Sequence, residues 1–282
     1  MTAPFWDNLE HHVERDSFWM SHARVRAHIN RAVSGDAATW PVTWLKRTLA
    51  GELPAARALS IGSGAGSLER DLVQQGIVLD VTGVEITEAP VREAERLAVE
   101  AGLADRVRYL QTDAREVLRG ERNLDAIFFH ASLHHFDRLD ELMRLAHDAL
   151  KPSGFLYLDE YIGPSMHQWN LLRLLPANLA YCFVPWRARR TKIVRTPRNP
   201  DDPTEAIASA EIVPAVEKWF EVQHRRDYGG NVVSLVYSNL RPDDAAALDR
   251  AVARLYACER VVRQWQRSYH AVIVARPRRS AT

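Results

Sequence analysis

The sequence predicts an α/β protein in which helices pack on both faces of a mainly parallel β-sheet. Two observations lead to this fold class. Short apolar segments alternate with helical patterns between residues 57 and 160, and this alternation requires crossover connections between parallel strands. Acids and histidines follow the apolar segments at their C-terminal ends, and open α/β sheets bind ligands at that edge.

The first strand, over 58–61, runs directly into three alternate glycines, Gly62, Gly64 and Gly66. Glycine permits the backbone angles of a sharp strand-to-helix turn and lets a ligand approach the main chain closely. The helix that follows points free N–H groups at such a ligand. A dinucleotide fingerprint would need a further glycine at position 67, where this chain has Ser67. The turn therefore predicts a nucleotide-type cofactor other than a dinucleotide.

The second and third strands each end in an acid. The segment 79–84 delivers Glu85, which lies 85 − 62 = 23 residues after the first glycine, and an acid at about this spacing is suited to accept hydrogen bonds from ribose hydroxyls. A helical pattern over 90–101 leads to a third strand over 107–111, which is followed by Asp113.

The fourth strand, over 124–129, opens into a loop with three histidines at 130, 134 and 135. A helix is predicted over 138–150, and it ends at a Lys-Pro-Ser-Gly sequence. The fifth strand, over 155–158, ends in Asp159 and Glu160. Neighbouring side chains on a strand point to opposite faces, so we expect only one of these two acids to enter a cleft.

This order of motifs, from residue 57 to 160, resembles the core of the class I S-adenosylmethionine-dependent methyltransferases. The resemblance implies a seven-stranded Rossmann-like sheet whose last strand is antiparallel. It implies S-adenosylmethionine as cofactor, with Asp113 near the adenine amino group. Many family members carry an acid where this chain has Ser60, and Glu69 is the nearest acid in sequence that could compensate. The cofactor-binding residues implied are Ser60, Gly62, Gly64, Gly66, Glu85, Ile86, Asp113, Ala114 and His130.

Four parts of the chain are predicted: an N-terminal helical cap over 1–53, the cofactor-binding core over 54–160, a lid or substrate-shaping insertion over 161–212, and a C-terminal completion of the sheet over 213–282. The last part shows strand patterns at 219–224 and 269–275 and a long helical pattern at 242–266, with a glycine turn at 226–231.

The insertion contains a basic cluster that supports two interpretations. It is either a solvated loop that pairs with Asp201, Asp202 and Glu205, or a recognition element for a phosphate or carboxylate on the substrate. The cluster consists of Arg187, Arg189, Arg190, Lys192, Arg195 and Arg198.

The overall composition favours a small-molecule partner. The 282 residues carry a formal net charge of +1, too small to hold the protein to nucleic acid or to an acidic membrane. The place of the Asn/Asp-Pro-Pro-aromatic motif of base-amine methyltransferases reads His-Ala-Ser-Leu, so nucleic acid is not expected as a partner. Cys182 and Cys258 lack metal-ligand spacing and are expected to be buried apolar residues. No signal-peptide pattern and no membrane-spanning run occur, so we expect a cytoplasmic protein with no membrane partner and a possible homodimer.

A hydroxyl acceptor must lose its proton during methyl transfer, and a base within about 3 Å would accelerate this roughly 10²- to 10⁴-fold. The catalytic candidates are His134, His135, Glu160 and Tyr161. Imidazole titrates near neutrality, so His134 or His135 is the favoured base, although a His-His pair in this loop is also consistent with packing or capping. A metal site built from Asp113, Asp159 and a histidine has no supporting ligand spacing, so no metal is expected.

The function that fits these observations is methyl transfer from S-adenosylmethionine to a small molecule, with a hydroxyl oxygen of a sugar, polyketide or other secondary metabolite as acceptor. Two alternatives stay open. A nicotinamide-dependent oxidoreductase shares the strand-turn-helix opening, and a non-catalytic module would bind the cofactor without transfer, because fold alone does not decide function.

Overall fold

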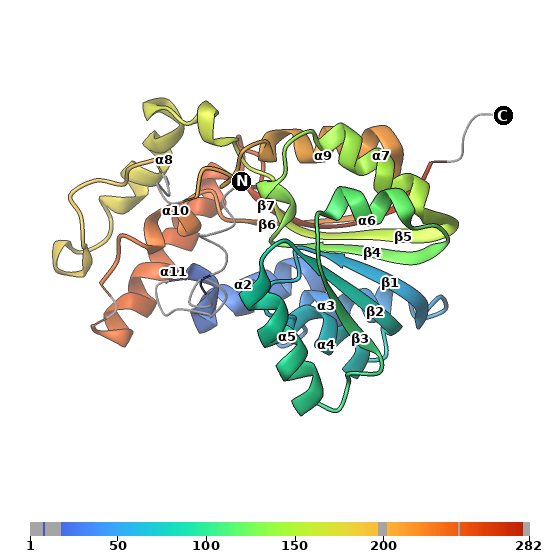
Figure 1. Ribbon diagram of the computed structural model, residues 1–282. Helices are drawn as coiled ribbons and strands as arrows, with labels where there is room; N and C mark the ends of the chain where they lie inside the picture. Colours follow the sequence, from blue (N-terminus) through green and yellow to red (C-terminus); the bar gives the residue numbers. More distant parts are fainter. Residues whose placement is uncertain (1–7, 9–17, 197–201, 242, 279–282) are drawn as a thin grey trace.

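The computed structural model describes residues 8, 18–196, 202–241 and 243–278, and its centre is a seven-stranded sheet (Figure 1). The strand order is β3-β2-β1-β4-β5-β7-β6. β7 runs antiparallel to both of its neighbours, and the other adjacent pairs are parallel, which confirms the predicted fold class. The strands are β1 (Ala55–Ile61), β2 (Val78–Glu85), β3 (Val107–Gln111), β4 (Leu124–His130), β5 (Leu150–Tyr161), β6 (Phe220–Gly229) and β7 (His270–Pro277).

Helices cover both faces of the sheet. In Figure 1, α6 (Ala114–Gly120), α7 (Leu139–Ala149) and α9 (Ile212–Trp219) lie above the sheet, and α3 (Pro41–Thr48), α4 (Ser67–Gln74) and α5 (Glu88–Glu100) lie below it. The two faces bury separate apolar clusters. The central strand β4 is buried on both faces over residues 126–129, which explains its continuous apolar run.

A second group of helices stands at one end of the molecule, where α8 (Leu171–Tyr181), α10 (Val233–Tyr237) and α11 (Ala245–Val262) lie together (Figure 1). α2 (Ala23–Ser34) packs beside β6 and α11. Short 3-10 turns complete the described elements: η2 (Trp19–Ser21), η3 (Leu133–His135), η4 (Met166–Gln168), η5 (Trp186–Ala188) and η6 (Ser209–Glu211).

The N-terminal 53 residues are predicted to be helical, and their described part contains η2, α2 and α3. Residues 1–7 and 9–17 lie outside the described residues. The division of the chain at residues 53, 160 and 212 stays a prediction. No described helix combines the length and the apolar composition that crossing a membrane requires.

The structure corrects three local predictions. The segment 226–231 is not a turn throughout, because β6 continues to Gly229 and the chain turns at Gly229 and Gly230, where φ is +91° and +85°. The long C-terminal helix begins at Ala245, where the Asp244 side chain accepts a hydrogen bond from the Ala247 N–H (2.9 Å) and caps it. Cys182, at the C-terminal end of α8, is exposed, whereas Cys258 is partly buried and packs against the core.

Candidate functional site

A cleft of about 1930 Å³ opens at the carboxyl edge of the sheet. The residues that follow β1, β2, β3, β4 and β5 all contribute to its wall, as expected for an open α/β sheet. Residues of η2, of the segment 204–207 and of β7 line it from the other side. Most of the candidate residues from the sequence therefore face one continuous space.

The glycine turn forms one wall of this cleft. Gly62 and Gly66 have φ values of +71° and +73°, which side-chain-bearing residues rarely adopt. A Cβ at Gly62 would lie 2.5 Å from the Cβ of Ser132, and one at Gly66 would lie 2.1 Å from the Tyr109 hydroxyl oxygen. Gly64 has a φ of +51° and, like Gly62, lines the cleft. The glycines that line the cleft therefore carry no side chain. Tyr109 of β3 and Ser132 of the histidine loop lie directly against the turn.

Glu85 lies at the end of β2, beside this turn. Its Oε2 accepts a hydrogen bond from the Gly64 N–H (3.2 Å), and its Oε1 accepts from the N–H groups of Ile86 (2.8 Å) and Thr87 (3.1 Å). The carboxylate is thereby fixed at the cleft wall. A ligand hydroxyl that replaced the Gly64 N–H as hydrogen-bond donor would meet Glu85 Oε2 already oriented as an acceptor.

Asp113 and Ala114 lie at the start of α6, and Ile86 follows β2; all three line the cleft. The Asp113 side chain caps α6 by accepting a hydrogen bond from the Arg115 N–H (2.7 Å). Of the implied cofactor residues on or after β1, β2 and β3, Gly62, Gly64, Glu85, Ile86, Asp113 and Ala114 line the cleft, whereas Ser60 and Gly66 do not.

Ser60 and Glu69 do not belong to the cleft wall. Ser60 is buried in β1, and Glu69 is buried behind the turn and is not among the described residues that line the cleft. Burial raises the pKa of the Glu69 carboxyl. Glu69 interacts with Ser60 and lies near His130 but does not line the cleft, so compensation by Glu69 for the missing acid stays a prediction.

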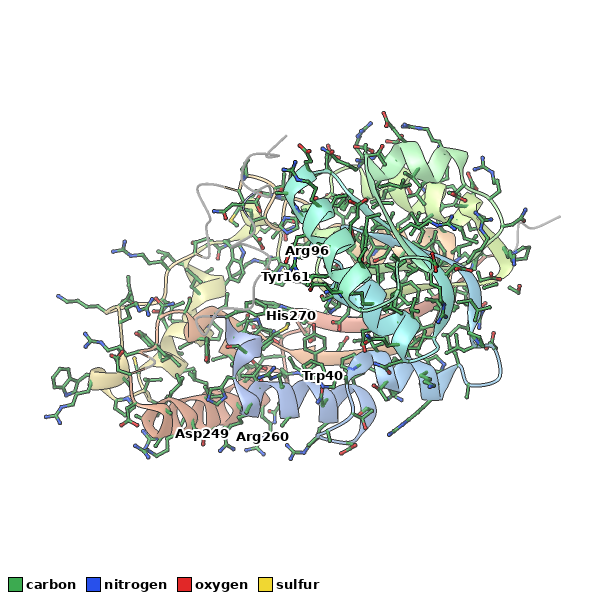
Figure 2. The ribbon with its side chains drawn as sticks, turned by 60° about the horizontal axis from the view of Figure 1, so that its bottom comes forward. Trp40, Arg96, Tyr161, Asp249, Arg260 and His270 are labelled. Atoms are coloured by element: carbon green, nitrogen blue, oxygen red, sulfur yellow. The ribbon has the colours of Figure 1, made fainter. Side chains whose placement is uncertain are left out.

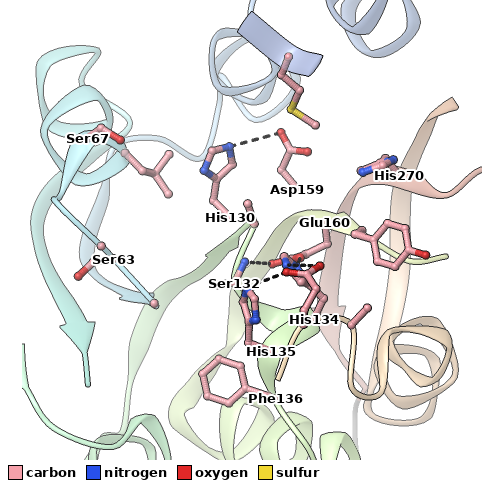
Figure 3. A pocket seen from close by; sticks show the side chains of 18 of the residues that line it. Ser63, Ser67, His130, Ser132, His134, His135, Phe136, Asp159, Glu160 and His270 are labelled. Atoms are coloured by element: carbon pink, nitrogen blue, oxygen red, sulfur yellow. Dashed lines mark hydrogen bonds and ion pairs between the residues drawn. The ribbon is translucent and has the colours of Figure 1, made fainter. Parts of the chain in front are cut away.

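The nearest carboxylate in the cleft to His130 is Asp159, at the end of β5. His130 Nε2 lies 3.8 Å from Asp159 Oδ2, and the Tyr228 hydroxyl donates to Asp159 Oδ1 (2.8 Å). Asp159 and Glu160 do reach opposite sides of β5, but both line the cleft. The expectation that only one would enter is wrong, because the cleft wraps around the end of the strand (Figure 3).

Glu160 holds His134 in a fixed orientation. Its Oε1 accepts hydrogen bonds from the N–H groups of Ser132 and Leu133 (both 2.6 Å), and its Oε2 lies 2.8 Å from His134 Nδ1 (Figure 3). A carboxylate at Nδ1 selects the tautomer in which that nitrogen carries the proton and Nε2 is free to accept one.

The electrostatic environment separates the two neighbouring histidines. Burial lowers the pKa of His134, but the hydrogen bond to Glu160 and the charges of Glu160, Glu205 and Asp202 outweigh it, and the net pKa is raised. Burial and the adjacent His134 hold the pKa of His135 well below its ordinary value. His134 is therefore the more basic imidazole of the pair.

Two acids from the insertion meet these histidines. Asp202 Oδ2 lies 3.4 Å from His135 Nδ1, and the two Glu205 carboxylate oxygens lie 3.9 Å from His134 Nε2 and 4.0 Å from His135 Nε2. Burial raises the pKa of Glu205. Asp202 and Glu205 therefore do not pair with the described members of the basic cluster, as one interpretation of the sequence expects; Arg198 and Asp201 lie outside the described residues.

Tyr161 contributes an aromatic wall. Its hydroxyl donates to the Pro164 carbonyl (2.9 Å), and its ring packs edge-on against His134 and His270 at centroid distances of 6.3 and 5.2 Å. Burial raises the pKa of the Tyr161 hydroxyl. Figure 2 shows Tyr161 and His270 in the middle of the molecule, whereas Asp249 and Arg260 lie at its outer surface.

Sequence reasoning did not assign Asp202, Glu205 or His270 to the site. Each comes from a segment far from the core motifs, and no local spacing connects it to the histidine loop. Only the site residues that directly follow a predicted strand can be recognised from a pattern in the sequence.

His134, His135 and Glu205 each offer one ligand atom, and these atoms lie within 4.8 Å of one another. The triplet differs from the Asp113, Asp159 and histidine set that the sequence considers. The expectation of no metal stays a prediction.

Comparison with known proteins identifies the core. Residues 59–158 match the model of a family described as "Methyltransferase domain". The 27-O-demethylrifamycin SV methyltransferase of Amycolatopsis mediterranei is 33% identical over 123 residues, which cover 43% of this chain and 45% of that protein. The ubiquinone biosynthesis O-methyltransferase of Pasteurella multocida is 28% identical over 126 residues, covering 41% of this chain and 50% of the other. The matched stretch thus spans about half the length of these relatives.

Solved structures extend the likeness in fold to nearly the whole chain. Geranyl diphosphate C-methyltransferase from Streptomyces coelicolor A3(2) superposes with a TM-score of 0.57 at 14% identity, covering 98% of this chain and 96% of the other. The [4+2]-cyclase SpnF superposes with a TM-score of 0.53 at 17% identity, covering 93% and 96%. At such identities the likeness concerns the fold alone. The core of the chain, residues 59–158, thus matches a methyltransferase domain, and the whole chain shares its fold with these solved structures.

Proposed function

We propose that this protein transfers a methyl group from S-adenosylmethionine to a hydroxyl oxygen of a small molecule such as a sugar, a polyketide or another secondary metabolite. One observation carries the proposal: the glycine turn with Glu85 and Asp113 and the His134–Glu160 pair line the same cleft. The names of the rifamycin and ubiquinone relatives, both O-methyltransferases, support an oxygen acceptor.

One group of residues is placed to contact the adenosine part of S-adenosylmethionine, and another is placed to contact its amino-acid end. Glu85 is placed to accept hydrogen bonds from ribose hydroxyls, and Asp113 stands where the family's adenine contact lies. The main chain at Gly62 and Gly64, which lines the cleft, allows the cofactor to approach closely. Because Ser60 is buried, we assign the charged partner of the cofactor's amino-acid end to Asp159, which lines the cleft beside His130.

His134 acts as the general base in this proposal. Its Nδ1–H is held by Glu160, so Nε2 is the atom that takes the acceptor's proton. Both Glu160 oxygens are already engaged, which makes Glu160 a positioning residue rather than a second base. The Tyr161 hydroxyl is likewise engaged, and its ring shapes the acceptor side of the cleft. The cofactor supplies the activated methyl group when bound, so alignment and deprotonation are the tasks left to the protein.

The first experiment is a calorimetric titration of S-adenosylhomocysteine into the protein, with NADH as a parallel ligand. We expect micromolar binding of S-adenosylhomocysteine, at least tenfold weaker in Glu85→Ala, a loss of about 1.4 kcal/mol. Glu88→Ala, an exposed acid on α5, is the matched control and binds normally. Binding of NADH instead would favour the oxidoreductase alternative.

The second experiment follows transfer of labelled methyl groups from S-adenosylmethionine to a panel of hydroxylated sugars and polyketides. His134→Ala should lower kcat by roughly 10²- to 10⁴-fold with cofactor affinity unchanged. His167→Ala, at an exposed histidine on η4, should retain full activity. Cofactor binding without turnover on any acceptor would leave the non-catalytic module as the better description.

The cytoplasmic location, the possible homodimer and the absence of a nucleic-acid partner stay predictions from the sequence.

A further inference from the structure

α8 exposes an apolar face that no described element covers. Its inner face buries Leu174, Ala177, Ala180 and Tyr181. The outer face carries leucines at one side of the helix, and apolar residues continue beyond its C-terminal end as far as η5. Leu171 and Trp186 are 86% and 74% exposed. We call this set the α8 apolar face: Leu171, Leu172, Leu175, Leu179, Phe183 and Trp186.

The leucines form one continuous stripe. Positions 171, 172, 175 and 179 fall within about a quarter to a third of the helix circumference at 3.6 residues per turn. A helix that is apolar on both its inner and outer faces normally has a partner on each. Exposed apolar patches of this kind on folded proteins mark contacts with other proteins or with membranes.

The segment around this face is strongly cationic. Between Glu160 and Asp201 the sequence has no acid and seven basic residues, in a chain whose net charge is only +1. None of those in the described range forms an ion pair with a described carboxylate, since Asp202 and Glu205 face the histidines instead. The seven are Arg173, Arg187, Arg189, Arg190, Lys192, Arg195 and Arg198.

Local hydrogen bonds hold the basic segment in place behind α8. Arg189 donates to the carbonyls of Val184 (2.8 Å) and Cys182 (2.9 Å), and the Arg190 N–H donates to the Asn239 carbonyl (2.7 Å). Asn178 of α8 donates to the Val194 carbonyl (3.0 Å) and accepts from the Val194 N–H (2.9 Å). These contacts keep the described part of the basic segment, residues 187–195, next to α8, at the end of the molecule where Figure 1 shows this helix.

From this combination we propose that the α8 apolar face docks on the surface of a bilayer containing anionic lipids. Leucine, phenylalanine and tryptophan side chains enter the interface between headgroups and acyl chains, and the surrounding arginines and lysine meet lipid phosphates. Such docking requires no spanning helix. It differs from the sequence expectation of no membrane partner, which rests on the net charge of the whole chain and not on this local charge.

A second copy of the chain fits the surface less well. In a two-fold contact the same residues of both copies meet, so the basic residues between 187 and 195, a stretch of sequence without acids, would oppose one another. An anionic lipid surface supplies the complementary charge that a second copy lacks.

The α8 apolar face lies close to the cleft along the chain, so docking would bear on how the acceptor reaches the cleft. Met166 and Trp169 line the cleft, and α8 begins at Leu171, two residues further along the chain. This step rests on the proposed function: when the protein is docked on the bilayer, the side of its cleft that receives the methyl acceptor would face an amphiphilic acceptor held in the bilayer.

The test is cosedimentation of the full-length protein with vesicles of phosphatidylcholine containing 30 mol% phosphatidylglycerol (about a third anionic lipid), compared with phosphatidylcholine alone. We expect binding to the anionic vesicles that weakens as salt is raised. The double variant Leu172→Glu/Leu175→Glu should bind at least tenfold less. Val99→Glu, at an exposed apolar position of α5, should bind like the wild type.

A charge variant, Arg187→Gln/Arg190→Gln/Lys192→Gln, should lose most of the preference for anionic vesicles while its circular dichroism stays unchanged. The proposal is overturned if the wild type does not sediment with anionic vesicles, or if the leucine variant sediments equally well. It is also overturned if sedimentation velocity without lipid shows self-association that the leucine variant abolishes, which would assign the face to a second copy.

S-adenosylhomocysteine affinity is measured on the same samples. Normal affinity in the leucine variant shows an intact core, so failure of docking and failure of the proposed methyl transfer remain distinguishable.

Discussion

At the scale of single residues, the His134–Glu160 pair has the largest bearing on function. The groups that face His134 are Glu160, Glu205, Asp202, His135 and Tyr161. Burial lowers the pKa of the imidazole, and the carboxylates, with Glu160 first, raise it above its ordinary value. A base must be neutral to accept a proton, so activity should rise with pH through the pKa of His134.

Glu160→Gln removes the largest of the effects that raise the pKa of His134, so burial is then opposed only by the charges of Glu205 and Asp202. The pKa of His134 should fall, so the rising limb of the pH profile of kcat/KM should move to lower pH. The plateau should also fall, because a weaker base transfers the proton less readily. A pH profile measured from 5 to 9 checks this. An unshifted limb with a lower plateau would indicate that Glu160 has only a structural role.

Gly62 provides a second test at this scale, one of stability. Gly62→Ala places a Cβ against Ser132 at a positive φ, and we expect it to lower the free energy of unfolding by about 1–3 kcal/mol. Gly120→Ala is the control, since nothing lies within 4 Å of its Cβ and its φ is not positive. Urea unfolding measures both, and equal midpoints would contradict the strain argument.

At the scale of elements, a buried carboxylate joins α11 to the start of α10. Glu259 of α11 accepts hydrogen bonds from the N–H groups of Gly230 (2.9 Å), Val232 (2.8 Å) and Val233 (3.0 Å). These groups belong to the turn after β6 and have no helical partner at this end of α10. Glu259 therefore holds in place the helices on which α8 packs.

Glu259→Gln keeps the shape of the side chain but turns one acceptor into a donor that opposes a backbone N–H. We expect a loss of about 1–3 kcal/mol of unfolding free energy. Amide hydrogen exchange should quicken first at 230–233, ahead of the sheet. Glu100→Gln, on the exposed end of α5, should change the unfolding free energy by less than about 0.5 kcal/mol. If amide hydrogen exchange quickened uniformly across the whole chain, Glu259 would not act as a local link between α11 and the start of α10.

The elements also show what the sequence could predict. β3 has the predicted bounds, and the glycine turn, Glu85 and Asp113 line one cleft, because each depends on a strand and the residue directly after it. Asp202 and Glu205 could not be placed, because their approach to His134 depends on how a 58-residue connection between β5 and β6 folds back (219 − 161 = 58). The α6 helix was also not predicted, because seven residues give too few turns for a periodic pattern.

At the scale of the whole molecule, buried neutral histidines link stability to pH. Burial and the nearby Arg263 lower the pKa of His28 to about 4, and burial lowers that of His270 to about 3. In the unfolded chain both titrate near 6.5. Their contribution to stability is therefore complete above pH 6.5 and is lost as the pH falls from 6.5 toward 4.

The urea midpoint should decrease between pH 7 and pH 4.5, and His28→Phe, which keeps a ring against Tyr256, should flatten this dependence. His167→Gln, at an exposed position, should leave the slope unchanged. A His28→Phe slope equal to that of the wild type would assign the acid sensitivity to other groups.

The strand order has a consequence for synthesis on the ribosome. Among the described strands, β6 pairs only with β7, and β7 lies between β6 and β5 in the sheet. The strand that emerges sixth thus has no neighbour to join until the seventh has left the exit tunnel. Through the translation of more than a hundred residues (270 − 161 = 109), the edge of β5 stays unpaired, open to pairing with other chains. Nascent chains stalled before residue 270 should therefore depend on chaperones more than the released protein does.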